Sequence, residues 1–164
     1  GMDEEVAAIL ALPHDAAKVR AEAAEMRALI EEEKPPRDLW DIKLVPGGLI
    51  DLEFIAQVAG LTGQIEGPDR TANTVEALAR LAPAFVDAQA RQDLCDAWAL
   101  YLALTQMIRL CLTGPFDRKD VPPGLADLLL AATDLPDFSV LEAHLKETAS
   151  KVRGIFERLL KKRK

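Results

Sequence analysis

The sequence has few aromatic residues and no long apolar segment. Aromatic side chains make up 5% of its 164 residues, although 49% of the residues are hydrophobic, mostly Ala, Leu, Val and Ile. No uninterrupted apolar run approaches the ~20 residues that a helix needs to cross a bilayer. The start, GMDEEVAAIL, is acidic where a signal peptide would be basic. We therefore expect a cytoplasmic protein that is not inserted in a membrane.

Cysteine and histidine are also scarce. The two cysteines, Cys95 and Cys111, lie in apolar, helix-like stretches and form no CxxC motif, and the only histidines are His14 and His144. Disulfide frameworks and zinc sites need more of these residues at closer spacing. We predict that both cysteines are buried free thiols, which suits a reducing compartment, and that the chain holds no metal ion.

Positive charge is in short supply as well. The net charge of -7 argues against a nucleic-acid partner, because such proteins need a basic face to neutralise phosphates. It leaves room for one bound nucleotide at a local site. The only basic cluster is the KKRK end at 161–164, which we interpret as cations that favour the C-terminal dipole of a helix.

Helical periodicity covers most of the chain, and strand-like alternation is nearly absent. The pattern predicts helices at about 4–12, 15–34, 48–61, 72–81, 85–112, 124–132 and 139–160. Proline pairs and glycine-rich stretches separate them. We therefore predict an all-α fold, one antiparallel bundle of six or seven helices that forms a single domain over residues 1–164.

Apolar stripes and capping residues predict which side chains of these helices lie inside and where the helices begin. The expected stripes include Val19, Ala23, Met26 and Ile30; Leu52, Ile55, Ala56 and Ala59; Val75, Leu78 and Leu81; Leu94, Ala97, Trp98, Tyr101, Leu104, Ile108 and Cys111; and Leu141, Leu145, Ala149, Val152, Ile155, Phe156 and Leu159. Asp15, Thr71 and Ser139 are the expected N-caps of their helices.

The stretch DIKLVPGGLIDLEF at 41–54 is the most distinctive part of the chain. Gly47 and Gly48 stand at a predicted helix start, where unpaired N–H groups carry partial positive charge. This arrangement suits a phosphate, and it is equally common at ordinary helix starts. No Walker motif and no GxGxxG pattern surrounds the glycines, so they alone do not identify a nucleotide site.

The two carboxylates after the glycines point in different directions. Asp51 and Glu53 are rotated by ~200° on a helix, so they cannot act on one atom. Arg27 and Lys43 are plausible partners for Asp51, and Asp41 is a further ion-pair candidate. Either these residues form a structural cluster that pins the loop, or Asp51 and Glu53 help to close a site. The local chemistry leaves both alternatives open.

The residues from Asp41 to Gln57, DIKLVPGGLIDLEFIAQ, resemble a known family. Together with Met26-Arg27, RTANTVEALARL at 70–81 and VRGIFERLL at 152–160, they resemble the helical domain that follows the nucleotidyltransferase domain in glutamine synthetase adenylyltransferases. The uridylyltransferase of the PII signal protein has a similar Gly-Gly-Leu helix start, but DLEF followed by IAQ fits the adenylyltransferase better. The short basic end after FERLL looks like a natural C-terminus, so the resemblance implies an excised C-terminal fragment.

The resemblance also implies a function for the parent enzyme. Such enzymes use ATP and Mg²⁺ to transfer AMP to a tyrosine of glutamine synthetase, and they remove it by phosphorolysis under control of PII and glutamine. The family's catalytic signature, Gly-Ser followed by Asp-x-Asp, is missing from this sequence, and DRKD at 117–120 does not replace it. We therefore expect that the fragment is inactive alone and needs no cofactor of its own.

The resemblance finally implies a role for the Gly-Gly stretch. Lys43, Gly47, Gly48, Asp51 and Glu53 would face the preceding nucleotidyltransferase domain, close to its nucleotide. An alternative is a non-enzymatic module that docks glutamine synthetase or PII. An exposed apolar patch near 47–53 would favour the first function, and a patch on the last two helices would favour the second.

Overall fold

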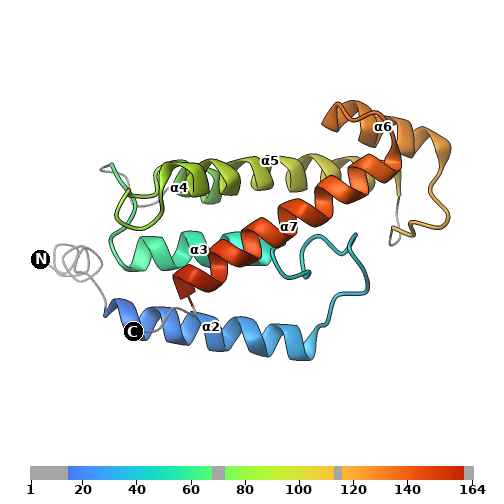
Figure 1. Cartoon of the computed structure of the whole chain (residues 1–164). Helices are drawn as coiled ribbons and strands as arrows, with labels where there is room; N and C mark the ends of the chain where they lie inside the picture. The colour runs from blue at the N-terminus through green and yellow to red at the C-terminus, as the bar shows by residue number, and fades with distance from the viewer. Residues whose placement is uncertain (1–14, 68–72, 113–115, 161–164) are drawn as a thin grey trace, which may run out of the picture.

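The structure, a computed structural model, describes residues 15–67, 73–112 and 116–160, and within these ranges it contains six α-helices. The predicted helix at 4–12, Thr71 and the KKRK end lie outside the described residues. The helices are α2 (Ala16–Glu33), α3 (Leu49–Leu61), α4 (Thr74–Ala79), α5 (Ala88–Cys111), α6 (Pro123–Thr133) and α7 (Phe138–Leu160) (Figure 1).

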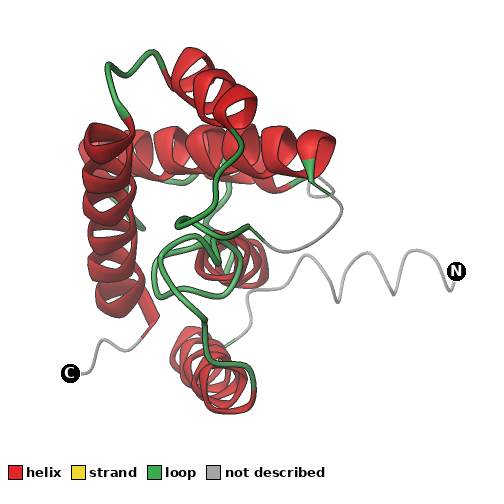
Figure 2. Ribbon diagram, turned by 90° about the vertical axis from the view of Figure 1, so that its right-hand side faces the viewer, coloured by secondary structure: helices red, strands yellow, loops and turns green. Residues whose placement is uncertain are grey.

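The long helices form a layer that α7 crosses. In Figure 1, α2, α3 and α5 lie one above another with α3 in the middle, and successive helices run in opposite directions. Helix α7 passes diagonally over this layer and contacts α2, α3, α5 and α6. Figure 2 shows α2 and α3 nearly end-on, α5 lying across the view above α3, and α7 along one side, so α5 crosses α3 at a steep angle. The all-α prediction is confirmed, with α7 as the element that ties the bundle together.

Side chains and prolines set most helix ends as the sequence predicts. Asp15 caps α2 by accepting from the N–H groups of Ala17 and Lys18, and α2 ends at Glu33, before Pro35-Pro36. Asn73 caps α4 by accepting from Glu76 N–H at 3.0 Å, and the predicted cap Thr71 lies outside the described residues. One predicted cap is wrong. Asp137 accepts from Val140 N–H at 2.9 Å, so the predicted cap Ser139 lies inside the first turn of α7.

The core matches the predicted stripes on α3 and α7, where every predicted inward residue is buried. Three predictions are wrong. Met26 is 51% exposed because Arg27 occupies the inward position of α2, and Val75 is 46% exposed on the short helix α4. Cys111 is exposed near the end of α5, whereas Cys95 is half-buried; both are free thiols. Within the described ranges, no helix is long and apolar enough to span a membrane.

Candidate functional site: the Gly-Gly loop and the Asp51 network

Residues 41–48, here called the Gly-Gly loop, form a tight turn stacked on the start of α3. The N–H groups of Leu44 and Val45 both donate to the Asp41 carbonyl, and Gly48 N–H donates to the Val45 carbonyl at 2.8 Å. Leu49 N–H then donates to the Ile42 carbonyl at 3.0 Å. The N–H groups at the start of α3 thus donate to carbonyls of the loop. These N–H groups are therefore not available to bind an anion.

The two glycines are required by close contacts inside the domain. Gly47 has φ +84°, and a Cβ there would lie 1.9 Å from the carbonyl oxygen of Ala149 on α7. A Cβ on Gly48 would lie 2.1 Å from the carbonyl oxygen of Ile42. Only glycine fits both positions. Within the described residues, the surfaces that the glycines allow to approach are α7 and the loop itself.

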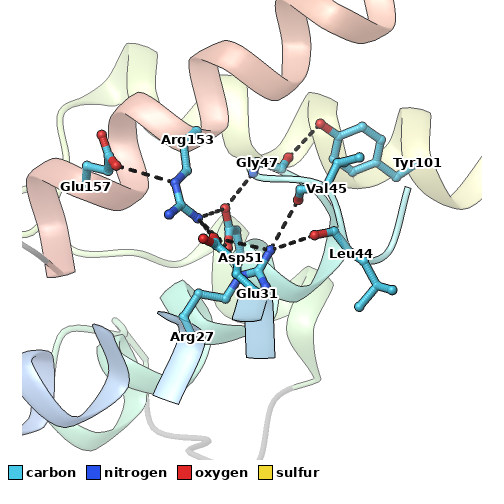
Figure 3. Close-up of polar contacts among 9 residues, drawn as sticks. All are labelled: Arg27, Glu31, Leu44, Val45, Gly47, Asp51, Tyr101, Arg153 and Glu157. Carbon is cyan, nitrogen blue, oxygen red and sulfur yellow. Dashed lines mark hydrogen bonds and ion pairs between the residues drawn. The ribbon is translucent and has the colours of Figure 1, made fainter. Parts of the chain in front are cut away.

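Asp51 lies at the centre of a partly buried polar network. It comprises Asp51, Arg27, Glu31 and Arg153 and is called here the Asp51 network (Figure 3). Asp51 is 0% exposed. One carboxylate oxygen accepts from Arg27 Nε at 2.5 Å, and the other accepts from Gly47 N–H at 2.5 Å and from Arg153 Nη1 at 3.0 Å. Three donors from three segments thus converge on one carboxylate.

The two arginines extend the network to α2, α7 and the loop. Arg27, also 0% exposed, donates through Nη2 to the Leu44 carbonyl at 2.9 Å and to the Val45 carbonyl at 3.3 Å. Arg153 Nη1 lies 2.7 Å from Glu31 Oε1. Arg153 Nε also lies 3.5 Å from Glu157 Oε2 on the same helix. The buried charge of Asp51 is thus compensated by two guanidinium groups, as a buried carboxylate requires. Burial alone would lower the pKa of Arg153, but the neighbouring carboxylates, Asp51 foremost, raise it above its usual value.

Tyr101 holds the loop from the other side of the bundle. Its hydroxyl donates to the Gly47 carbonyl at 2.7 Å from the middle of α5 (Figure 3). Burial, and secondly the negative charge of Asp51, raise the pKa of Tyr101. The phenol therefore stays neutral and keeps its proton for Gly47. Both the N–H and the C=O of Gly47 are thus bound by side chains, so the loop is held in one conformation.

The predicted site residues fall into two groups. Gly47, Gly48 and Asp51 are buried in the domain, whereas Lys43 and Glu53 are exposed and make no ion pair with Asp51 in the described part of the chain. The predicted Arg27–Asp51 pair is confirmed, and the proposed inclusion of Lys43 and Glu53 in that cluster is wrong.

The remaining ion-pair candidate has a different partner. The Asp41 carboxylate accepts from the backbone N–H of Arg37 at 3.3 Å, and Arg37 Nε lies 3.7 Å from the same carboxylate oxygen. Asp41 therefore pairs with the residue four positions before it and does not join the Asp51 network. Lys43 lines a pocket of 360 Å³ between α2 and the loop, with Ile30, Lys34 and Ile50. The predicted roles of Lys43 and Glu53 beside a nucleotide stay predictions.

Sequence reasoning missed three members of this site: Glu31, Tyr101 and Arg153. Arg153 lies 102 residues from Asp51 along the chain, and helical periodicity does not report such a contact. The available signals were weak: Arg153 falls in the family-like VRGIFERLL stretch, and Tyr101 is the only tyrosine. Within the described ranges, no group of three or more His, Cys, Asp or Glu residues is placed to hold a metal ion.

Chemically, the Asp51 network is a brace. Both oxygens of Asp51 accept bonds from groups of the same domain, and no part of its side chain reaches solvent. A general base or metal ligand needs an accessible lone pair. Of the two alternatives that the sequence left open for Asp51, this geometry favours the structural one.

These features define a small all-helical domain with a Gly-Gly helix start clamped by the buried Arg27 and the half-buried Arg153. A family model described as GlnD PII-uridylyltransferase matches residues 24–160, and the chain belongs to this family. The match includes all four members of the Asp51 network. No solved structure matches the chain.

Curated relatives agree with the resemblance to adenylyltransferases. The chain is 70% identical over 160 residues to a bifunctional glutamine synthetase adenylyltransferase/adenylyl-removing enzyme of Mesorhizobium japonicum. It is 45% identical over 160 residues to the enzyme of that name from Bartonella quintana, and 44% identical over 154 residues to that of Rhizobium meliloti. These matches cover 98%, 98% and 92% of the chain, but only 16% of each relative.

Proposed function

We propose that the chain is an accessory helical domain of a glutamine synthetase adenylyltransferase/adenylyl-removing enzyme. The supporting observation is the 70% identity over 98% of the chain to an enzyme of that name, of which the chain spans 16%. In this proposal a nucleotidyltransferase domain uses ATP and Mg²⁺ to transfer AMP to glutamine synthetase in the cytoplasm and removes it by phosphorolysis. The helical domain acts beside it and performs neither reaction alone.

The Gly-Gly loop is the part of the domain that we assign to the contact with the nucleotidyltransferase domain. The Asp51 network and Tyr101 fix the loop from α2, α5 and α7, while Lys43 and Glu53 remain exposed on it and on the first turns of α3. A rigid segment with two exposed charges suits an interface, because little conformational entropy is lost on binding. Lys43 would reach a nucleotide phosphate, and Glu53 would contact the partner domain.

Alanine substitutions in the full-length enzyme test this role. Lys43→Ala and Glu53→Ala are expected to lower the rate of adenylylation at least about tenfold without changing the unfolding transition of the domain. Lys18→Ala and Glu22→Ala, two exposed residues of α2, serve as matched controls and should leave the rate unchanged. Unchanged rates in both loop variants would refute the interface role.

A calorimetric titration with ATP and Mg²⁺ tests the accessory role itself. The isolated chain is expected not to bind, whereas a longer protein that carries the nucleotidyltransferase domain should bind. Adenylylation of glutamine synthetase by the isolated chain would refute the proposal.

One observation favours a second function, a docking module for glutamine synthetase or PII. Leu128 on α6 and Val140 on α7 are 46% and 39% exposed, and Leu110 at the end of α5 is 79% exposed. No comparably exposed large apolar side chain occurs at 47–53. These side chains at the end of α5 and on α6 and α7 are candidate contacts for a protein partner, as are Met26 and Leu29 on α2, which are 51% and 45% exposed. Leu110→Ser and Leu128→Ser would then weaken binding of the isolated chain to glutamine synthetase or PII, and unaltered binding would exclude this role for these side chains.

A further inference from the structure

A pocket of 660 Å³ lies between α7 and the segment that leads into the Gly-Gly loop. Leu39, Val45 and Pro46 form its apolar wall on the loop side, and Ala143 and Ala149 leave space on the α7 side. The volume falls within the range of ~300–1,000 Å³ that is usual for small-molecule sites. The pocket belongs to the domain alone, so its capacity to bind a ligand does not depend on the proposed function.

Three cationic side chains line this pocket and keep unused hydrogen-bond donors. Arg118 binds Glu142 through Nε at 2.9 Å and Nη2 at 2.8 Å, which leaves its Nη1 without a partner in the described part of the chain. Arg153 uses Nε and Nη1 for carboxylates, so its Nη2 is likewise unused there. Lys146 is exposed and forms no ion pair among the described residues.

The carboxylates of the pocket are largely occupied. Glu142 accepts from Trp40 Nε1 at 2.7 Å and from two nitrogens of Arg118, so both its oxygens are bound. Asp38 uses one oxygen to accept from Trp40 N–H at 2.9 Å. The groups that remain for a ligand are therefore mainly donors, and they match a ligand with negatively charged acceptor oxygens.

The charge balance around the pocket limits the charge of that ligand. Asp38 and Glu142 line the pocket beside the three cations, and Arg153 is further compensated by Asp51, Glu31 and Glu157. A polyphosphate would meet these carboxylates and bind poorly, whereas one negative charge needs only the unused donors. We propose that this pocket binds a small organic carboxylate that carries an apolar body, with the carboxylate on Lys146, Arg118 and Arg153.

The two tryptophans of the chain provide a specific readout. Trp40 donates its indole N–H to Glu142, which is held by Arg118 in the pocket wall, whereas Trp98 lies on α5 and does not line the pocket. Titration of the ¹⁵N-labelled chain with benzoate should therefore shift the Trp40 indole resonance saturably and leave that of Trp98 in place. Benzamide, the neutral analogue, should shift neither. An absent Trp40 shift at high millimolar benzoate, or an equal response to benzamide, would overturn the proposal.

A matched pair of lysines on α7 tests the location of the carboxylate. Lys146→Ala is expected to weaken benzoate binding at least about fivefold, whereas Lys151→Ala, an exposed lysine of the same helix outside this pocket, should leave it unchanged. Binding that is equally affected by both variants would place the ligand elsewhere. Phenyl phosphate, which carries more negative charge, should bind no more tightly than benzoate; tighter binding would contradict the inferred charge balance.

Discussion

Replacement of Arg27 by methionine should destabilise the domain strongly. Methionine fills a similar volume, but it removes the donors that bind Asp51 and the carbonyls of Leu44 and Val45. Asp51 would remain fully buried with Arg153 as its only cationic partner. Removal of one member of a buried ion pair typically costs about 3–5 kcal/mol. Because small domains are stable by about 5–15 kcal/mol, Arg27→Met should lose a large part of the total free energy of unfolding.

Urea unfolding followed by circular dichroism measures this loss at neutral pH. Arg109→Met, a change of an exposed arginine on α5, is the matched control and should cost less than about 0.5 kcal/mol. Arg27→Met combined with Asp51→Asn should be more stable than the sum of the single losses predicts, by at least about 1 kcal/mol, because it removes both charges of the pair. A loss below about 1 kcal/mol for Arg27→Met, or strict additivity, would refute the view of the Asp51 network as a buried brace.

Three further predictions concern the loop, its tyrosine and the thiols. Gly47→Ala should cost about 1–3 kcal/mol more in urea unfolding than Gly63→Ala, since both positions have positive φ but only the first would place a Cβ against the α7 backbone. The pKa of Tyr101 is higher in the folded state than the value of about 10 in the unfolded chain, so folding favours the neutral phenol. The free energy of unfolding should therefore be constant below about pH 10 and should fall as the pH rises above 10. In urea midpoints measured across this range, Tyr101→Phe should show a smaller fall than the wild type. Cys111 should react with a thiol reagent well before Cys95, whose pKa is raised by burial and by a neighbouring carboxylate, as peptide mapping by mass spectrometry would detect.

Helix α2 illustrates what periodicity predicts and where it fails. The pattern correctly located the helix and its Asp15 cap, because local backbone preferences set both. It placed Met26 inside, since an apolar residue is ordinarily the better choice for a core position. The inward position belongs instead to Arg27, which is stable there because Asp51 and two loop carbonyls neutralise and bind it. Asp51 and the two loop carbonyls lie in other segments of the chain. The apolar periodicity of α2 alone therefore cannot identify them.

The candidate site shows the same division between local and distant information. The Gly-Gly block correctly predicted the helix start, and of the two plausible partners that local chemistry offered for Asp51, Arg27 and Lys43, the structure confirms Arg27. Lys43 and Glu53 were placed in the same cluster because they are near in sequence, but their side chains are exposed. Arg153, which completes the network, comes from α7, and only the diagonal crossing of that helix brings it to Asp51.

The burial of Asp51 also determines how losses of activity in the proposed full-length enzyme should be interpreted. Asp51 lies two residues before Glu53, so a catalytic role for it is easily assumed. Its substitution would lower activity whether its role is catalytic or structural. In this geometry the loss arises because the Gly-Gly loop is released from α2 and α7, so it should appear together with a lowered unfolding midpoint. Lys43 and Glu53 make no such contacts in the described part of the chain. A loss of activity in their variants at unchanged stability would therefore report on the loop surface itself, and these two residues, rather than Asp51, are the informative probes of the interface.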